Sequence, residues 1–183
     1  MAAELGITAG EGINGVLYQA WWSIANNFQQ NSYAGYLAIV RILVGYHFLE
    51  VGWPKVARGF YTGESLPGQL ADATLDPLIW HRAFIFDVVV PNPVLFSYLV
   101  AFGEVAIGLS LLTGCLVRVA SLFGAFHNFN ILFAIAIPSG NGVQIRLNRL
   151  YIFLHLIFVF AAAGRSLGLD GWLKKKFPQC WLF

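Results

Sequence analysis

One acidic residue inside an apolar run constrains this chain more than any other feature. Residues 94–113 contain a single charged side chain, Glu104, and are long enough to cross a bilayer core of about 30 Å. An ionised group at the centre of a bilayer costs at least about 2.5–3.5 kcal/mol. Glu104 must therefore be neutral, be paired with a cation, or face a polar cavity. Gly108 shares its helical face and leaves room there for another helix or a flat ligand.

The composition indicates an integral membrane protein of one domain. Of the 183 residues, 58% are hydrophobic and only 11% are charged, whereas soluble domains average about 25% charged residues. The formal net charge of +2 is small and scattered along the chain, which excludes a nucleic-acid-binding surface. Residues 1–40 contain no Lys or Arg, so a secretory signal peptide is not expected. Cys115 and Cys180 match no metal or redox spacing and are expected to be free thiols.

Hydrophobic patterning predicts an all-α integral membrane fold, a bundle of four transmembrane helices. The membrane domain is expected at 33–165, with an N-terminal segment, 1–32, before it and an interfacial tail, 166–183, after it. The predicted spans are residues 33–53, 94–113, 117–138 and 147–164. Residues 13–28 place apolar side chains on one stripe, which predicts an N-terminal amphipathic helix on a membrane surface or a partner protein.

A long connection separates the first two spans. We expect Pro54 to end the first span, and we expect short helices at 66–75 and 78–86 because a loop as long as 54–93 is usually ordered for a function. Four crossings put both termini on one side of the membrane. Since extended loops follow the positive-inside rule weakly, we expect that side to be the cytoplasmic face of a prokaryotic-type inner membrane.

Each predicted span contributes one polar side chain at a common depth. Counted at 1.5 Å per residue, these side chains lie about 12–15 Å from the side of the termini. They are Arg41, Glu104, His127 and His155. We predict an ion pair between Arg41 and Glu104, because a membrane usually retains either charge only when it is paired.

Three interpretations of this polar layer stay open. In the first, it only holds the helices together, with the histidines hydrogen-bonded to the backbone or to each other. If the layer is instead an internal site, His127 and His155 would complete a polar network with Asn128 and Asn130. In the second, it forms a quinone or proton-relay site. In the third, His47, His127 or His155 ligates a haem, a chlorophyll or a metal, although no cluster has the spacing of a metal site.

Three segments of the chain resemble the DoxX/DoxD family of small four-span membrane proteins. The first is residues 41–45, Arg-Ile-Leu-Val-Gly, and the second is residues 103–108, Gly-Glu-Val-Ala-Ile-Gly. The third is residues 163–170, Ala-Gly-Arg-Ser-Leu-Gly-Leu-Asp, which is similar to the Gly-Arg-x-Leu-Asp ending of the family and is the most specific. In length and span number the chain resembles the DoxD branch, the larger subunit of thiosulfate:quinone oxidoreductase.

This resemblance implies a reaction in which two thiosulfates are oxidised to tetrathionate and a membrane quinone is reduced. Glu104 and Arg41 are then the candidate catalytic residues. Glu104 or a histidine of the membrane interior would supply a proton, and Arg41 would stabilise a negatively charged oxygen of the ring. The candidate cofactor-binding residues are His127, His155 and His47. Surface cations available for an anionic substrate are Lys55, Arg58, Arg82, Arg146 and Arg149.

The alternative function is that of a non-catalytic accessory subunit of a large respiratory or photosynthetic membrane complex. Aromatic residues make up 16% of the chain, which suits packing against partner subunits, lipid or pigment, and an outward-facing histidine would then ligate chlorophyll or haem. Under both functions we expect partners among other membrane-protein subunits. A channel or transporter is less favoured, because no inverted repeat or pair of broken helices is visible.

Overall fold

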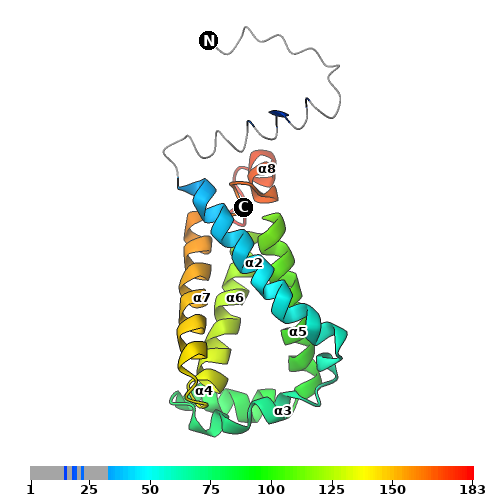
Figure 1. Ribbon diagram of the computed structural model, residues 1–183, viewed down its shortest axis with the longest axis vertical. Coiled ribbons are helices and arrows are strands. Elements are labelled where there is room, and N and C mark those ends of the chain that lie inside the picture. Colours follow the sequence, from blue (N-terminus) through cyan, green and yellow to red (C-terminus); the bar gives the residue numbers. More distant parts are fainter. Residues whose placement is uncertain (1–14, 16–17, 20–21, 23–32) are drawn as a thin grey trace.

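The computed structural model describes residues 15, 18, 19, 22 and 33–183 (Figure 1). The amphipathic helix predicted at 13–28 lies almost wholly outside these residues and stays a prediction. The described part of the chain is helical without strands, and four of its helices are long and apolar enough to cross a membrane. The predicted fold class is therefore confirmed. The four are α2 (Ala34–Ala57), α5 (Pro93–Thr113), α6 (Val117–Ile131) with its π-helical continuation η4 (Leu132–Ala136), and α7 (Gly142–Ala161).

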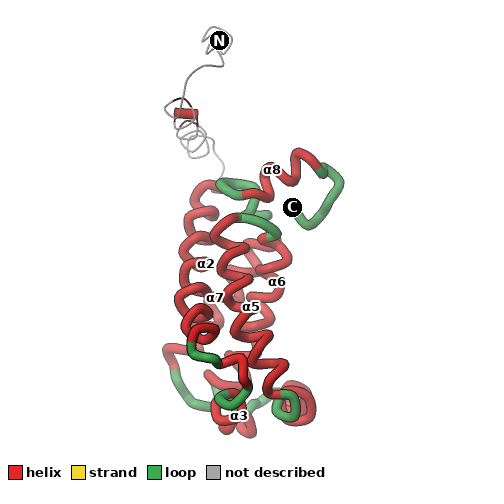
Figure 2. The backbone as a smooth tube through the Cα atoms, turned by 90° about the vertical axis from the view of Figure 1, so that its right-hand side faces the viewer, coloured by secondary structure: helices red, strands yellow, loops and turns green. Residues whose placement is uncertain are grey.

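The four long helices form two packed pairs that separate towards one end. Helix α2 crosses α5 obliquely, and α6 runs beside α7 (Figure 1). Helices α5 and α6 meet near the C-terminal helix α8 (Leu169–Lys176) and lie apart at the opposite end, where the short helices of the connection sit (Figures 1 and 2). These are η1 (Phe60–Thr62), α3 (Leu66–Gln69), η2 (Ala71–Leu75), α4 (Ile79–Phe84) and the π-helical η3 (Ile85–Val89). The short helices expected in this connection are confirmed.

Glycines bring α2 and α5 into backbone contact. Gly45 and Gly52 lie two turns apart on one face of α2. A Cβ atom at Gly45 would lie 2.9 Å from Leu111 Cβ, and one at Gly52 would lie 2.8 Å from Glu104 Cβ. On the α5 side, a Cβ at Gly108 would lie 2.8 Å from the Leu49 side chain. The space left by Gly108 therefore admits another helix, which is α2.

Helix α2 does not end at Pro54, so that prediction is wrong. The helix continues to Ala57, and Arg58 N donates to Pro54 O at 3.0 Å. A proline removes one backbone donor, but the turn that follows it still closes. The consequence is that Lys55 lies on the last turn of α2, within reach of α5.

Arg41 of α2 binds the segment that follows α7 and holds it against the bundle. This side chain is completely buried. Its Nη1 donates to Ala163 O at 3.1 Å and its Nη2 to Leu167 O at 2.8 Å. The Asp170 carboxylate lies near enough to attract the guanidinium group. We call Arg41, Asp170 and the backbone that they bind the C-terminal clamp.

Asp170 also holds the turn between α5 and α6. Its carboxylate accepts from Leu116 N at 2.7 Å and from Val117 N at 2.9 Å, which caps the start of α6. Its own amide donates to Gly114 O at 2.8 Å. Leu116 has a φ of +55°, which is unfavourable for a leucine, so the turn depends on these bonds. Segment 163–170, which resembles the family motif, thus stabilises the turn between α5 and α6.

The glycine contact predicts a selective loss of stability. Gly45→Ala should lower the free energy of unfolding by about 1–3 kcal/mol, because its Cβ would press on the Leu111 side chain and the Leu112 backbone. The measurement is unfolding of the purified protein in mixed micelles. Gly103→Ala is the matched control, since no atom lies within 4 Å of its Cβ position. Equal stability of the two variants would contradict the close crossing.

The C-terminal clamp predicts that a nearly isosteric change is damaging. Asp170→Asn should cost about 2 kcal/mol or more, because it turns a donor towards backbone N–H groups and removes the charge beside Arg41. Thermal unfolding monitored by size-exclusion chromatography measures the loss. Asp72→Asn, at an exposed position of η2, should unfold as the parent protein does. A clamp variant as stable as this control would show that the bonds to Asp170 are dispensable.

Candidate functional site

Glu104 lies at the meeting point of three helices. Its side chain is 2% exposed. Its Oε1 accepts a hydrogen bond from Lys55 Nζ of α2 at 2.5 Å and lies 2.8 Å from Nε2 of His127 on α6. Its second oxygen, Oε2, is buried and has no hydrogen-bond partner among the described residues. We call Lys55, Glu104 and His127 the Glu104 cluster.

The Glu104 cluster can hold and move a proton. Lys55 supplies the positive charge that allows a carboxylate to be buried at this depth. The carboxylate accepts from His127, so Nε2 carries a hydrogen and Nδ1 is the ring nitrogen left to bind or release a proton. Oε2 of Glu104 is a further position at which a proton can reside.

A groove of about 860 Å³ lies between α5 and α6. Its volume falls within the roughly 300–1,000 Å³ typical of sites for small molecules. The short helices of the connection line its far end, and most of its lining is apolar. Two of its few polar lining residues, Lys55 and His127, belong to the Glu104 cluster.

The predicted ion pair between Arg41 and Glu104 is wrong. Arg41 is bound in the C-terminal clamp, and Lys55 takes the place expected for it beside Glu104. Side chains on a helix point back towards its N-terminus. The Arg41 guanidinium therefore lies nearer the termini than its Cα depth suggests. The same geometry turns Lys55, beyond Pro54, back towards the membrane interior.

Of the three predicted histidines, only His127 reaches Glu104. His155 is completely buried on α7, where it packs on Phe48 and Gly124, and both its ring nitrogens lack hydrogen-bond partners among the described residues. His47 stacks on Tyr151 with ring centroids 4.8 Å apart. Neither lines the groove.

The network expected around the two asparagines of α6 is only partly as predicted. Asn128 donates to Gly124 O of its own helix at 2.8 Å instead of bonding a histidine. Asn130 does contact a histidine, but it is His81 of α4, at 3.0 Å. His81 in turn pairs with Asp76. Sequence reasoning missed this pair, although an acid and a histidine five residues apart in a helical loop were a visible signal.

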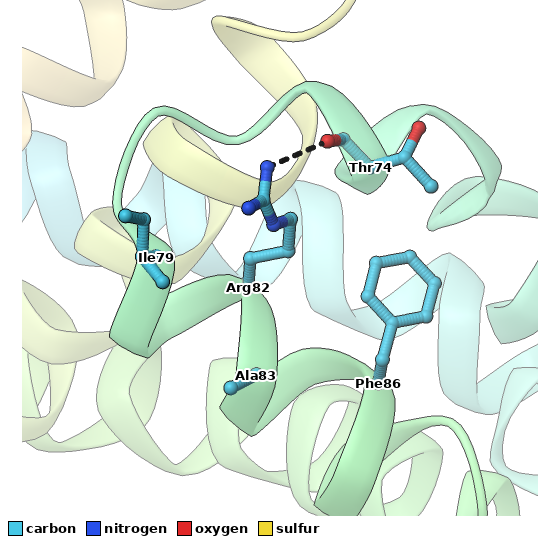
Figure 3. Close-up of a pocket in the computed structure, with 5 residues that line it drawn as sticks. All are labelled: Thr74, Ile79, Arg82, Ala83 and Phe86. Carbon is cyan, nitrogen blue, oxygen red and sulfur yellow. Dashed lines mark hydrogen bonds between the residues drawn. The ribbon is translucent and has the colours of Figure 1, made fainter.

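The cations of the loop side do not act alike. Lys55, expected at the surface, is committed to Glu104. Arg82 lies in a separate pocket of about 420 Å³, where it donates to Thr74 O at 3.2 Å beside Ile79 and Phe86 (Figure 3). This pocket shares no lining residue with the groove.

Cys115 is a poor candidate for sulfur chemistry. Both cysteines are free thiols. Burial, and then the negative charge of Asp170, raise the pKa of the Cys115 thiol. Since the thiolate is the nucleophile, a raised pKa lowers its reactivity. Among the described residues no group of three or more His, Cys, Asp and Glu side chains is arranged to hold a metal ion.

Comparison with known proteins agrees with the motifs. The family model described as DoxX matches residues 36–137, more than half of the chain. This region includes Lys55, Glu104 and His127 of the cluster and every residue that lines the groove. No curated protein and no solved structure matches the chain. The length of the family match, together with the four membrane-spanning helices, shows that the chain belongs to the DoxX family.

Proposed function

We propose that this DoxX protein is the membrane subunit of a quinone-linked oxidoreductase, and that quinone binds in the groove between α5 and α6. The proposal rests on one observation above all. A buried carboxylate, Glu104, is held by two side chains, Lys55 and His127, that line a large apolar groove. Convergent ionisable groups in an apolar cavity are typical of a site for chemistry.

The groove suits an apolar ligand that arrives from the bilayer. Leu99, Phe123 and Phe126 line it and are 55%, 64% and 59% exposed, so the groove is not closed over by other side chains of the described residues. The groove therefore opens on the surface that lipid would cover. A quinone has an apolar tail and a flat ring with oxygen acceptors, which matches an apolar opening leading to cationic donors.

The bound quinone would itself be the acceptor of two electrons. The chain itself supplies hydrogen bonds and protons. Lys55 and His127 can donate to an acceptor oxygen and stabilise negative charge on it. His127 can release a proton from Nδ1, while Glu104 on the Nε2 side stabilises the protonated ring beforehand. Uptake of a proton at Nδ1 would then restore the cluster, and a second such transfer would supply the second proton of the quinol.

The proposed electron donor is an anionic sulfur compound such as thiosulfate, which the resemblance to DoxD suggests. Cationic side chains at the loop end of the bundle would favour an anion there. These side chains are Arg58, Arg82, Arg146 and Arg149.

The experiment that decides between the two functions uses the protein isolated gently from native membranes. Co-purified quinone, reduced when thiosulfate is added, supports the proposal, whereas haem or chlorophyll bands would support the accessory-subunit function.

Removal of the acid tests the chemical part of the proposal. Glu104→Gln should lower quinone reduction by about a hundredfold or more, because it removes the group that stabilises a protonated His127. The measurement is the steady-state rate of quinone reduction in nanodiscs. Glu50→Gln is the control, since Glu50 is an exposed acid on α2. An unchanged rate in the Glu104 variant would remove the cluster from the mechanism.

Filling the groove tests the binding part separately. Gly103 lines the groove and has open space at its Cβ position, so Gly103→Phe should occupy ligand volume without a clash in the core. We expect quinone affinity to fall at least tenfold with little change in thermal stability. Gly68→Phe, at an exposed position of α3 that also has open space, should bind as the parent does. Unchanged affinity in Gly103→Phe would place the quinone elsewhere.

A further inference from the structure

A second buried polar cluster lies at the loop end of the groove, and the function proposed above does not use it. Asp76 follows η2, His81 lies in α4 and Asn130 lies in α6. Asp76 and His81 are each 1% exposed. His81 Nδ1 is hydrogen-bonded to Asp76 Oδ2, and His81 Nε2 lies 3.0 Å from Asn130 Oδ1. The three side chains join the loop helices to α6.

The hydrogen bonds determine how the Asn130 amide is oriented. Its Nδ2 donates to Phe126 O at 2.7 Å. A reversed amide would place two acceptor oxygens against each other, so Oδ1 must face His81. His81 Nε2 therefore carries the hydrogen of that bond. The contact between Nδ1 and Asp76 shares one more proton, which makes the pair neutral overall and explains how it can be buried.

Asn130 keeps one donor that these bonds do not use. An amide nitrogen has two hydrogens, and in the described part of the chain only Phe126 O accepts from Nδ2. Asn130 is partly exposed and lines the groove, as His127 does. Side chains three residues apart on a helix are neighbours, about 5–6 Å apart at Cβ. The groove thus has two adjacent polar side chains. His127 is hydrogen-bonded to the buried acid Glu104, and Asn130 is linked to the buried acid Asp76 through His81.

We propose that Asn130 is a second ligand-binding donor of the groove, and that the Asp76–His81 pair is a positioning unit that holds its amide in place. This inference rests on the proposed binding of quinone in the groove. With His127 and Asn130 donating together, the groove selects a lipid-soluble ring with two acceptor oxygens over a lipid with a single polar group.

The test uses the full-length protein in nanodiscs and decyl-benzoquinone labelled with ¹³C at one carbonyl at a time. Infrared difference spectra should show both carbonyl bands displaced to lower wavenumber on binding. Asn130→Leu should return one band to its unbound position and weaken binding about tenfold, as loss of one hydrogen bond predicts. Asn148→Leu is the control, because Asn148 donates to Gln144 O at 2.8 Å in the same helical manner but does not line the groove.

A positioning function for His81 makes a further demand. His81→Phe removes the bond to Asn130 Oδ1 and should lower the affinity for the probe, while His81→Gln keeps a donor and should restore most of it. A single displaced carbonyl band in the parent protein, or two displaced bands in Asn130→Leu, would overturn this inference and leave quinone binding intact. A single displaced band in the parent overturns the inference even if a variant does not fold. Failure of the parent to bind the probe would instead overturn the proposed function itself.

Discussion

The structure depends on keeping one carboxylate inside the membrane. Glu104 is nearly inaccessible, and Lys55 and His127 both bond the same oxygen of its side chain. Lys55 can reach it only because α2 approaches α5 at Gly52, whose missing side chain leaves room for Glu104 Cβ. The ion pair and the glycine contact are therefore two aspects of one helix crossing. Any side chain at Gly52 would separate the acid from its cation.

The packing of the two helix pairs leaves the groove as a consequence. On one side, glycines draw α2 onto α5; on the other, Gly124 of α6 makes room for the ring of His155 on α7. Helices α5 and α6 are joined by a short turn and contact each other over only part of their length. A space therefore remains between them, and the loop helices close it at one end. The loop helices and α6 are joined by the Asp76–His81–Asn130 cluster, which places a polar contact at that closed end.

The parts of the fold that depend on span length and hydrophobicity were predictable, and those that depend on side-chain direction were not. From the sequence alone, residues 94–113 could be recognised as a span, and Glu104 as a charged group inside it that needs a partner. The partners of Arg41 could not be recognised in this way. The depth of a Cα atom does not show where a long side chain ends, and the acceptors of Arg41 lie in the segment after α7. The inward position of Lys55 was not predictable either, because a proline at residue 54 is expected to end a helix, whereas α2 continues to Ala57. For His155, no periodicity in the sequence shows that its ring packs on Gly124.

The C-terminal clamp has a consequence for the order in which the protein is made. Arg41 belongs to α2 and is synthesised 122 and 126 residues before its acceptors, Ala163 and Leu167. Until that segment is made, the guanidinium group has neither of these carbonyl acceptors. Docking of the segment after α7 is then the event that encloses this charge, so a polypeptide truncated before Ala163 would present an unsatisfied cation to cellular quality control.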